Sequence, residues 1–116
     1  MQEFALFFKT TPSVQEDTLS PEQLQQSIKP WQDWIGSIAA QNKLAGKGSR
    51  LHPEVRIVKP DKSVLNGPFA DIKEVMGGFI IVRAAGYEEA LEMAKGCPIL
   101  LPPWHGSVEV RMIAAQ

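Results

Sequence analysis

The spacing of apolar residues changes several times along the chain, and each change predicts a new secondary-structure element. Residues 4–8 are all apolar and predict a short first strand. Residues 9–18 are mostly polar and contain Pro12, which is typical of a loop. The chain is therefore expected to open with a strand and to reach its first helix through a polar connection.

A helix is predicted to begin at residue 21, because its first turn and its apolar face are both recognisable. Ser20 suits the N-cap, Pro21 the first helical position, and Gln23 the position whose side chain can bond back to the cap. The apolar face then recurs every three or four residues. Its members are Leu24, Ile28, Trp31, Ile35 and Ile38.

Two features are expected to disturb or end this helix. Pro30 lacks a backbone donor and its ring collides with the preceding turn, so we expect a kink or two abutting helices. The helix is expected to end near residues 42–44, before a turn at Gly46 and Gly48.

A hairpin is predicted in the middle of the chain. Residues 55–58 and 63–65 form two short strand-like segments. Between them, residues 59–62 predict a turn in which Pro60 presets the backbone angle. The hairpin leads into a segment rich in turn residues, 66–78.

Three further elements complete the pattern. Residues 78–84 are almost continuously apolar and predict a strand buried on both faces. Residues 87–95 predict a second helix, with acidic residues in its first turn and Lys95 in its last. Residues 107–113 alternate between apolar and charged positions and predict the final strand.

The order of these elements predicts a ferredoxin-like α+β fold with an added hairpin strand. Two helices can cover only one face of such a sheet. The first strand is nevertheless apolar on both faces, because Phe7 points opposite to Phe4, Leu6 and Phe8. An uncovered apolar face favours a homodimer.

Composition narrows the class of protein. The chain has 116 residues, which suits one domain spanning 1–116. A net charge of −1 favours neither nucleic acid nor an anionic membrane as a partner. No apolar run is long enough to span a bilayer, and the first residues lack the basic region of a signal peptide. Because the single Cys97 cannot form an internal disulfide, we expect a cytoplasmic protein.

Several motifs spread over nearly the whole chain resemble one known family. They are Asn66–Glu74, Gly77–Phe79, Glu89–Leu91, Cys97–Pro98 and Gly106–Arg111. Together they are similar to the YCII-related, DGPF-domain family. The resemblance implies a ferredoxin-like fold that pairs into a dimeric α+β barrel.

The resemblance also implies a range of functions. Biochemical function in this branch is mostly unassigned, while the wider group is associated with a His–Asp pair. Fold relatives include lactone isomerases and small monooxygenases, and some members are encoded beside extracytoplasmic-type sigma factors. These associations leave open a binding module, an acid–base enzyme and a regulatory partner in transcription.

The chain departs from the family at the first position of the DGPF motif, where Asn66 replaces the usual Asp. Asn keeps the turn propensity and accepts hydrogen bonds, but it cannot ionise. A carboxylate mechanism centred on this position is therefore disfavoured. Asn66 and Phe69 have two interpretations: the lip of a ligand pocket, or a turn in which Phe69 plugs the core.

Three residues are candidates for proton transfer. Imidazole exchanges protons near neutral pH, which makes His105 a candidate, although a surface or strand-capping histidine is the alternative. Lys73 and Glu74 belong to the family motif and are candidates for acid–base or anion-binding work. Adjacent side chains rarely face the same way, so the alternative is a solvated pair that contributes little.

Arg111 and Trp31 complete the candidate residues. Arg111 and Glu109 are expected to face away from the helices, where an ion pair across a dimer interface is favoured over a substrate-binding arginine. Trp31 and Trp34 lie close to the apolar stripe of the first helix. Core packing is favoured for Trp31, and a pocket wall is the alternative.

Together these observations favour a small-molecule-binding or interaction module that forms a homodimer, without established catalysis. One alternative is a cofactor-free lyase or isomerase of small oxo-acids or lactones that uses His105, Glu74 or Lys73. The other is a regulatory partner in sigma-factor-linked transcription. We expect no cofactor, and no metal either, since neither His52 nor His105 has a second ligand at metal-binding spacing.

Overall fold

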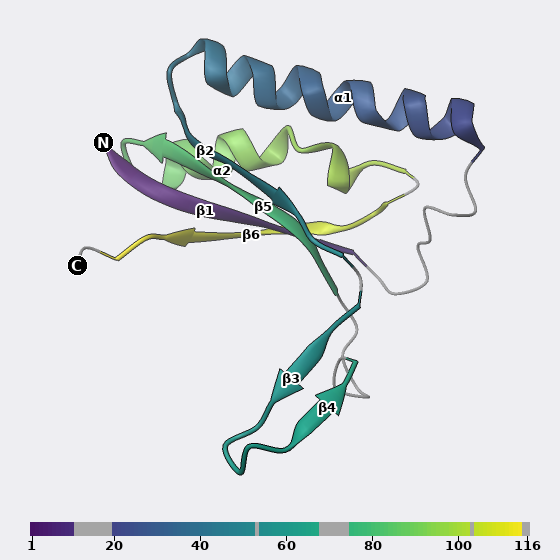
Figure 1. Cartoon of the computed structure of the whole chain (residues 1–116). Coiled ribbons are helices and arrows are strands. Elements are labelled where there is room, and N and C mark those ends of the chain that lie inside the picture. The colour runs from purple at the N-terminus through teal and green to yellow at the C-terminus, as the bar shows by residue number, and fades with distance from the viewer. Residues whose placement is uncertain (11–19, 53, 68–74, 103, 115–116) are drawn as a thin grey trace.

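Figure 1 shows a four-stranded sheet with two helices over one face and a small hairpin on the other side. The structure is a computed structural model that describes residues 1–10, 20–52, 54–67, 75–102 and 104–114. In chain order, the elements are β1 (Gln2–Thr10), α1 (Pro21–Ala40), β2 (Leu44–Arg50), β3 (Arg56–Val58), β4 (Val64–Asn66), β5 (Val75–Ala84), α2 (Tyr87–Lys95), the 3₁₀ turn η2 (Pro98–Leu100) and β6 (Ser107–Met112).

The main sheet has the strand order β2-β5-β1-β6, and every neighbouring pair is antiparallel. The connection from β1 to β2 contains α1, and the connection from β5 to β6 contains α2. Each helix therefore joins two strands that have a third strand between them, and both helices cover the same face (Figure 1). This is the ferredoxin-like arrangement, so the predicted fold class is confirmed.

The start of α1 is built by its local sequence. The Ser20 hydroxyl accepts a bond from the Gln23 N–H at 3.2 Å, and the Gln23 side chain accepts one from the Ser20 N–H at 2.8 Å. The predicted capping box is therefore present. The helix runs through Pro30 as one element rather than two and ends at Ala40. Pro30 is exposed, so water can reach the backbone carbonyl that loses its partner.

The position of β2 corrects the sequence analysis, because it occupies the segment for which Gly46 and Gly48 predicted a turn. The approach of β5 requires glycine there. Gly48 has a φ of +63°, and a Cβ on it would lie 1.7 Å from the Phe79 carbonyl oxygen. The pairing of β2 with β5 shifts register on both sides of Gly46. These glycines therefore mark bulges within a strand.

The predicted hairpin forms, but it is not part of the main sheet. Strands β3 and β4 make a separate two-stranded sheet in which Arg56 pairs with Asn66 and Ile57 with Leu65. Figure 1 shows this hairpin projecting from one end of the main sheet, on the side away from the helices. The second strand of the ferredoxin-like sheet is β2, whereas the sequence analysis assigned that place to the hairpin.

The core lies between the sheet and the two helices. Phe4 and Leu6 of β1 are buried there, beside Ile80 and Val82 of β5. Burial along β5 alternates, and the intervening positions are only half-buried. The prediction that this strand is buried on both faces is therefore wrong for the single chain, because no helix covers the second face.

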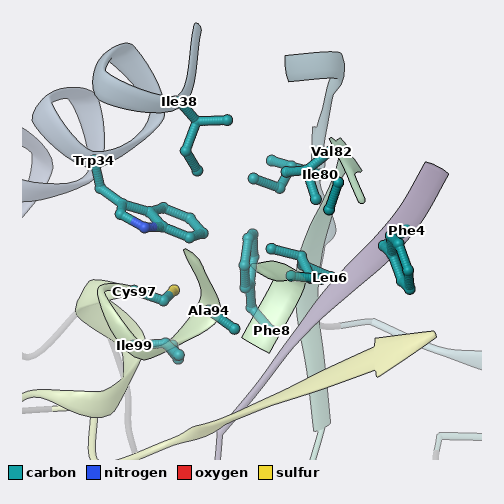
Figure 2. Packing of buried hydrophobic residues seen from close by; sticks show 12 residues of the cluster. Phe4, Leu6, Phe8, Trp34, Ile38, Ile80, Val82, Ala94, Cys97 and Ile99 are labelled. Atoms are coloured by element: carbon teal, nitrogen blue, oxygen red, sulfur yellow. The ribbon is translucent and has the colours of Figure 1, made fainter. Parts of the chain in front are cut away.

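The centre of the core is closed by α1 and by the segment that follows α2. Figure 2 shows Trp34 and Ile38 of α1 pointing into the cluster that contains Phe8, with Cys97 and Ile99 on another side. The Trp34 indole N–H donates to the Met93 carbonyl at 3.0 Å. This bond satisfies a buried donor and ties α1 to α2.

Candidate functional site

The candidate site is the face of the main sheet that no helix covers, which we call the open face. Strand alternation decides its membership, because side chains next to a core residue along a strand point the other way. Direct cross-strand partners share a face, and Phe7 is paired with Phe79 on one side and with Glu109 on the other. The central part of the open face consists of Ala5, Phe7, Lys9, Phe79, Ile81, Glu109 and Arg111, and the directly opposed Glu3 and Arg83 lie beyond it on the same face.

The middle of the open face is apolar. The rings of Phe7 and Phe79 lie with their centroids 6.4 Å apart and their planes inclined by 46°. Ala5 and Ile81, a directly opposed pair, continue this apolar surface along β1 and β5. Phe7, Phe79 and Ile81 are half-buried in the single chain, so part of each side chain still meets water.

A cluster of three charged side chains borders this apolar surface. Glu109 stands between two cations: the Lys9 Nζ lies 2.9 Å from its Oε1, and the Arg111 Nε lies 2.9 Å from its Oε2. Lys9 and Glu109 are partly buried, whereas the Arg111 side chain is 70% exposed. The ion pairs therefore hold a guanidinium group at the edge of the apolar surface while leaving it open to solvent.

The charge state of Glu109 follows from these neighbours. The hydrogen bond from Lys9 lowers the pKa of the Glu109 carboxyl below its usual value, partial desolvation opposes this effect, and attraction from Arg111 adds to it. Glu109 is therefore a carboxylate at neutral pH. One negative and two positive groups leave the cluster with an excess of one positive charge, which suits an anion better than a cation.

His105 lies at the end of the sheet, just before β6. Its side chain is exposed, and its backbone N–H donates to the Leu101 carbonyl at 3.1 Å. The backbone adopts a φ of 45°, in the left-handed region. The next residue, Gly106, packs so closely that a Cβ on it would lie 2.2 Å from the Lys9 carbonyl oxygen. This unusual backbone therefore lies next to a tight bend against β1.

Trp31 lies on the opposite side of the sheet from Arg111. Its ring contacts Phe8 edge-on with centroids 5.0 Å apart, and Trp34 in the same manner at 6.0 Å. These contacts place Trp31 at the border of the core, which is the interpretation that its spacing favoured. Within one chain, Trp31 and Arg111 do not meet at a common site.

Only part of the DGPF-like motif lies among the described residues. Asn66 ends β4, opposite Arg56, and its side chain is exposed. Phe69, Lys73 and Glu74 lie outside the described residues. Their predicted roles in a pocket or in proton transfer therefore remain predictions.

Lys9 is the site residue that the sequence analysis missed. The polar residues after Phe8 predicted a loop, but β1 continues to Thr10. The signal was strand alternation: a residue two positions after Phe7 shares its face if the strand continues. The bond between Lys9 and Glu109 spans 100 positions in the sequence, so no local pattern indicates it.

A hollow lies on the helix side of the sheet. It has a volume of about 390 Å³, between the first turns of α1 and the segment around η2. Gln23 and Gln26 form one wall, and Pro98, Leu101 and Trp104 form much of the other. This hollow contains none of the candidate residues from the sequence analysis.

Other chemical groups have structural explanations. Burial raises the pKa of the Cys97 thiol to about 12, so the buried sulfur stays protonated and behaves as a small apolar group. Among the described residues, no three side chains of the His, Cys, Asp and Glu types gather as a metal site would require. No helix in the described part of the chain has the length and apolar character needed to cross a membrane.

The fold and the open face define a ferredoxin-like α+β protein with one sheet face covered by helices and one uncovered. Comparison with known families is consistent with this class: the sequence model of the YCII-related domain matches residues 3–115. The chain therefore belongs to the YCII-related family, as its motifs predicted. A search of curated proteins finds no match.

Proposed function

We propose that this protein is a small-molecule-binding module that works as a homodimer, with two copies pairing their open faces. The observation that carries the proposal is the apolar pair Phe7 and Phe79 beside the cluster of Lys9, Glu109 and Arg111. An uncovered apolar surface of this kind marks a binding surface. The charged border supplies orientation and specificity.

A second copy suits the open face because the face carries both signs of charge. In a two-fold interface each patch meets an identical patch, so a patch of a single sign would repel itself. Here Glu109 can face a cation of the other copy, while Lys9 and Arg111 can face its carboxylate. The whole chain carries a net charge of only −1, so long-range repulsion between copies is small.

The proposed ligand is a small carboxylate with an apolar body. Arg111 reaches Glu109 through Nε, and a guanidinium group can hold a second carboxylate through its planar fork of donors. The apolar body would lie against Phe7 and Phe79. Pairing of two open faces would shield this region from water and strengthen the charged contacts.

Binding can be tested by thermal shift with matched ligands. A panel of small carboxylates and the corresponding neutral amides is added to the native protein, to Arg111→Gln and to Lys95→Gln. The control residue, Lys95, is also 70% exposed and ion-paired, but it lies on α2. We expect a carboxylate to raise the melting temperature of the native protein and of the control, but not of Arg111→Gln. Equal shifts with amides, or no effect of Arg111→Gln, would contradict the proposal.

A second function is supported by one observation on His105. A non-glycine residue with a φ of 45° at the edge of a sheet is the kind of backbone that gathers at functional sites. We propose, as the alternative, acid–base chemistry on small oxo-acids or lactones with His105 as the proton carrier. His105→Asn separates chemistry from structure, because Asn tolerates the left-handed backbone but cannot carry the proton. Lost turnover with retained stability supports the enzyme, whereas unchanged turnover contradicts it.

A further inference from the structure

The β3–β4 hairpin exposes an apolar pair that the described residues of its own chain do not cover. Val58 and Val64 are directly opposed, so their side chains share one face of the hairpin. They are 69% and 58% exposed. Ile57 and Leu65 form the next pair and point to the other face, where they are half-buried. The hairpin therefore carries apolar side chains on both faces.

The turn of this hairpin is well formed. The Lys62 N–H donates to the Lys59 carbonyl at 2.8 Å, and the Lys59 N–H donates to the Ser63 carbonyl at 2.9 Å. The Asp61 carboxylate accepts bonds from both the N–H and the hydroxyl of Ser63. A two-stranded hairpin is nevertheless at best marginally stable in water unless another surface supports it. A formed turn with an unsupported apolar face indicates that something packs there.

The position of the hairpin indicates where that support lies. It leaves the sheet after β2 and returns at β5, and it projects beyond the open face rather than over the helices (Figure 1). The radius of gyration is 15.6 Å, whereas a compact chain of this length would have roughly 13.4 Å. Because the hairpin projects on the side of the open face, a second copy that covers this face would lie beside the hairpin.

The solvent-exposed area of the chain is larger than that of a compact monomer, which leaves room for an interface with a second copy. The chain exposes 8115 Å², whereas a compact monomer of its mass exposes about 6,300 Å². The excess of about 1,800 Å² is roughly twice what one partner contributes to an interface of standard size. The exposed surface is therefore large enough for one dimer interface to include both the open face and the hairpin.

We propose that the β3–β4 hairpin is an arm that packs Val58 and Val64 against a second copy of this chain. The inference rests on the proposed homodimer and adds to it a second contact, which is separate from the pairing of open faces. The arm contributes apolar area at the end of the sheet, beyond the charged cluster. A second copy is the favoured occupant because, in the proposed homodimer, the partner subunit already packs on this side of the sheet.

The arm can be detected directly by nuclear magnetic resonance on mixed dimers. Copies with ¹³C-labelled valine methyl groups are mixed with unlabelled copies, and isotope-filtered spectra report contacts between the two. We expect intermolecular contacts from the methyl groups of Val58 and Val64. If a sample that sediments as a dimer shows only intramolecular contacts for these methyl groups, the arm is overturned while the dimer stands. A sample that stays monomeric at every concentration overturns the pairing of open faces as well.

Variants give an independent measurement. The double variant Val58→Ser, Val64→Ser should raise the dissociation constant of the dimer at least about tenfold, because two apolar side chains lose their burial in the interface. Lys59→Ser is the matched control, since Lys59 is an exposed hairpin residue outside the apolar pair. Amide spectra of each variant verify that the chain is folded. Equal dissociation constants for the double variant and the native protein would overturn the arm.

Discussion

Lys9 of β1 and Glu109 of β6 form an ion pair between neighbouring strands, with 2.9 Å between Nζ and Oε1. The pair therefore links the first strand of the chain to the last. The pair sits on the face of the sheet that the helices leave uncovered. Arg111 binds the second oxygen of the same carboxylate. The cluster thus combines a contact between β1 and β6 with an exposed cation, and the proposed function uses that cation for binding.

The Lys9–Glu109–Arg111 cluster predicts a pH-dependent contribution to stability. Because the folded state lowers the pKa of Glu109, its contribution is complete above the unfolded pKa and is lost as the pH falls through the folded value. The pKa of a glutamate in an unfolded chain is about 4.3. We expect the native protein to be more stable than Glu109→Gln at neutral pH, and the difference to shrink on acidification below that region.

Urea unfolding at a series of pH values measures this difference. Glu92→Gln is the control, because Glu92 is also ion-paired but is 71% exposed on α2. The difference in the free energy of unfolding between Glu92→Gln and the native protein should change little with pH. A difference for Glu109→Gln that stays constant from neutral to acidic pH would show that the carboxylate is not stabilised as described.

Gly48 and Gly36 predict opposite effects of the same substitution. Gly48→Ala places a Cβ 1.7 Å from the Phe79 carbonyl oxygen, at a φ of +63°. We expect a loss of more than about 3 kcal/mol in the free energy of unfolding, because backbone must move. Gly36→Ala meets nothing within 4 Å inside α1, and should gain about 0.5–1 kcal/mol. Chemical denaturation of both variants checks the prediction, and a tolerated Gly48→Ala would contradict the close approach of β2 to β5.

Local sequence signals account for the elements that were predicted well. The capping box of Ser20 and Gln23 marks the start of α1, and α2 spans the predicted residues 87–95. These signals act within a few residues, so they can be recognised without knowledge of the fold. The same holds for the turn at residues 59–62, which joins the two strands of the hairpin as its residues predict.

The strand β2 and the charged cluster were not predictable in the same way. Gly46 and Gly48 indicate a turn until the Phe79 carbonyl is placed against them, and that contact depends on the pairing of β2 with β5. In the sequence, Lys9 begins a polar segment that is typical of a loop, whereas in the structure β5 and β6 both pair with it and extend β1. In both cases, a distant strand decides the local structure.

Lys62 predicts a stabilising substitution in the arm. It adopts a φ of 70° at the last position of the turn that its N–H closes with the Lys59 carbonyl, a left-handed position that glycine normally fills in such hairpins. Lys62→Gly should stabilise the hairpin by about 1 kcal/mol, since it relieves the left-handed strain of a side chain. Hydrogen exchange at the Lys59 amide, which bonds to the Ser63 carbonyl, measures the local free energy of opening. Faster exchange in Lys62→Gly than in the native protein would contradict this account.

The pairing of open faces is tested most directly by sedimentation equilibrium over a range of concentrations. We expect the native protein to sediment with twice its chain mass of 12.8 kDa. Phe79→Glu places a charge in the apolar centre of the open face and should yield monomers, while Leu91→Glu, on the exposed side of α2, should remain dimeric. A native protein that sediments at 12.8 kDa at all concentrations, or a Phe79→Glu variant that dimerises as the native protein does, would contradict the pairing of open faces.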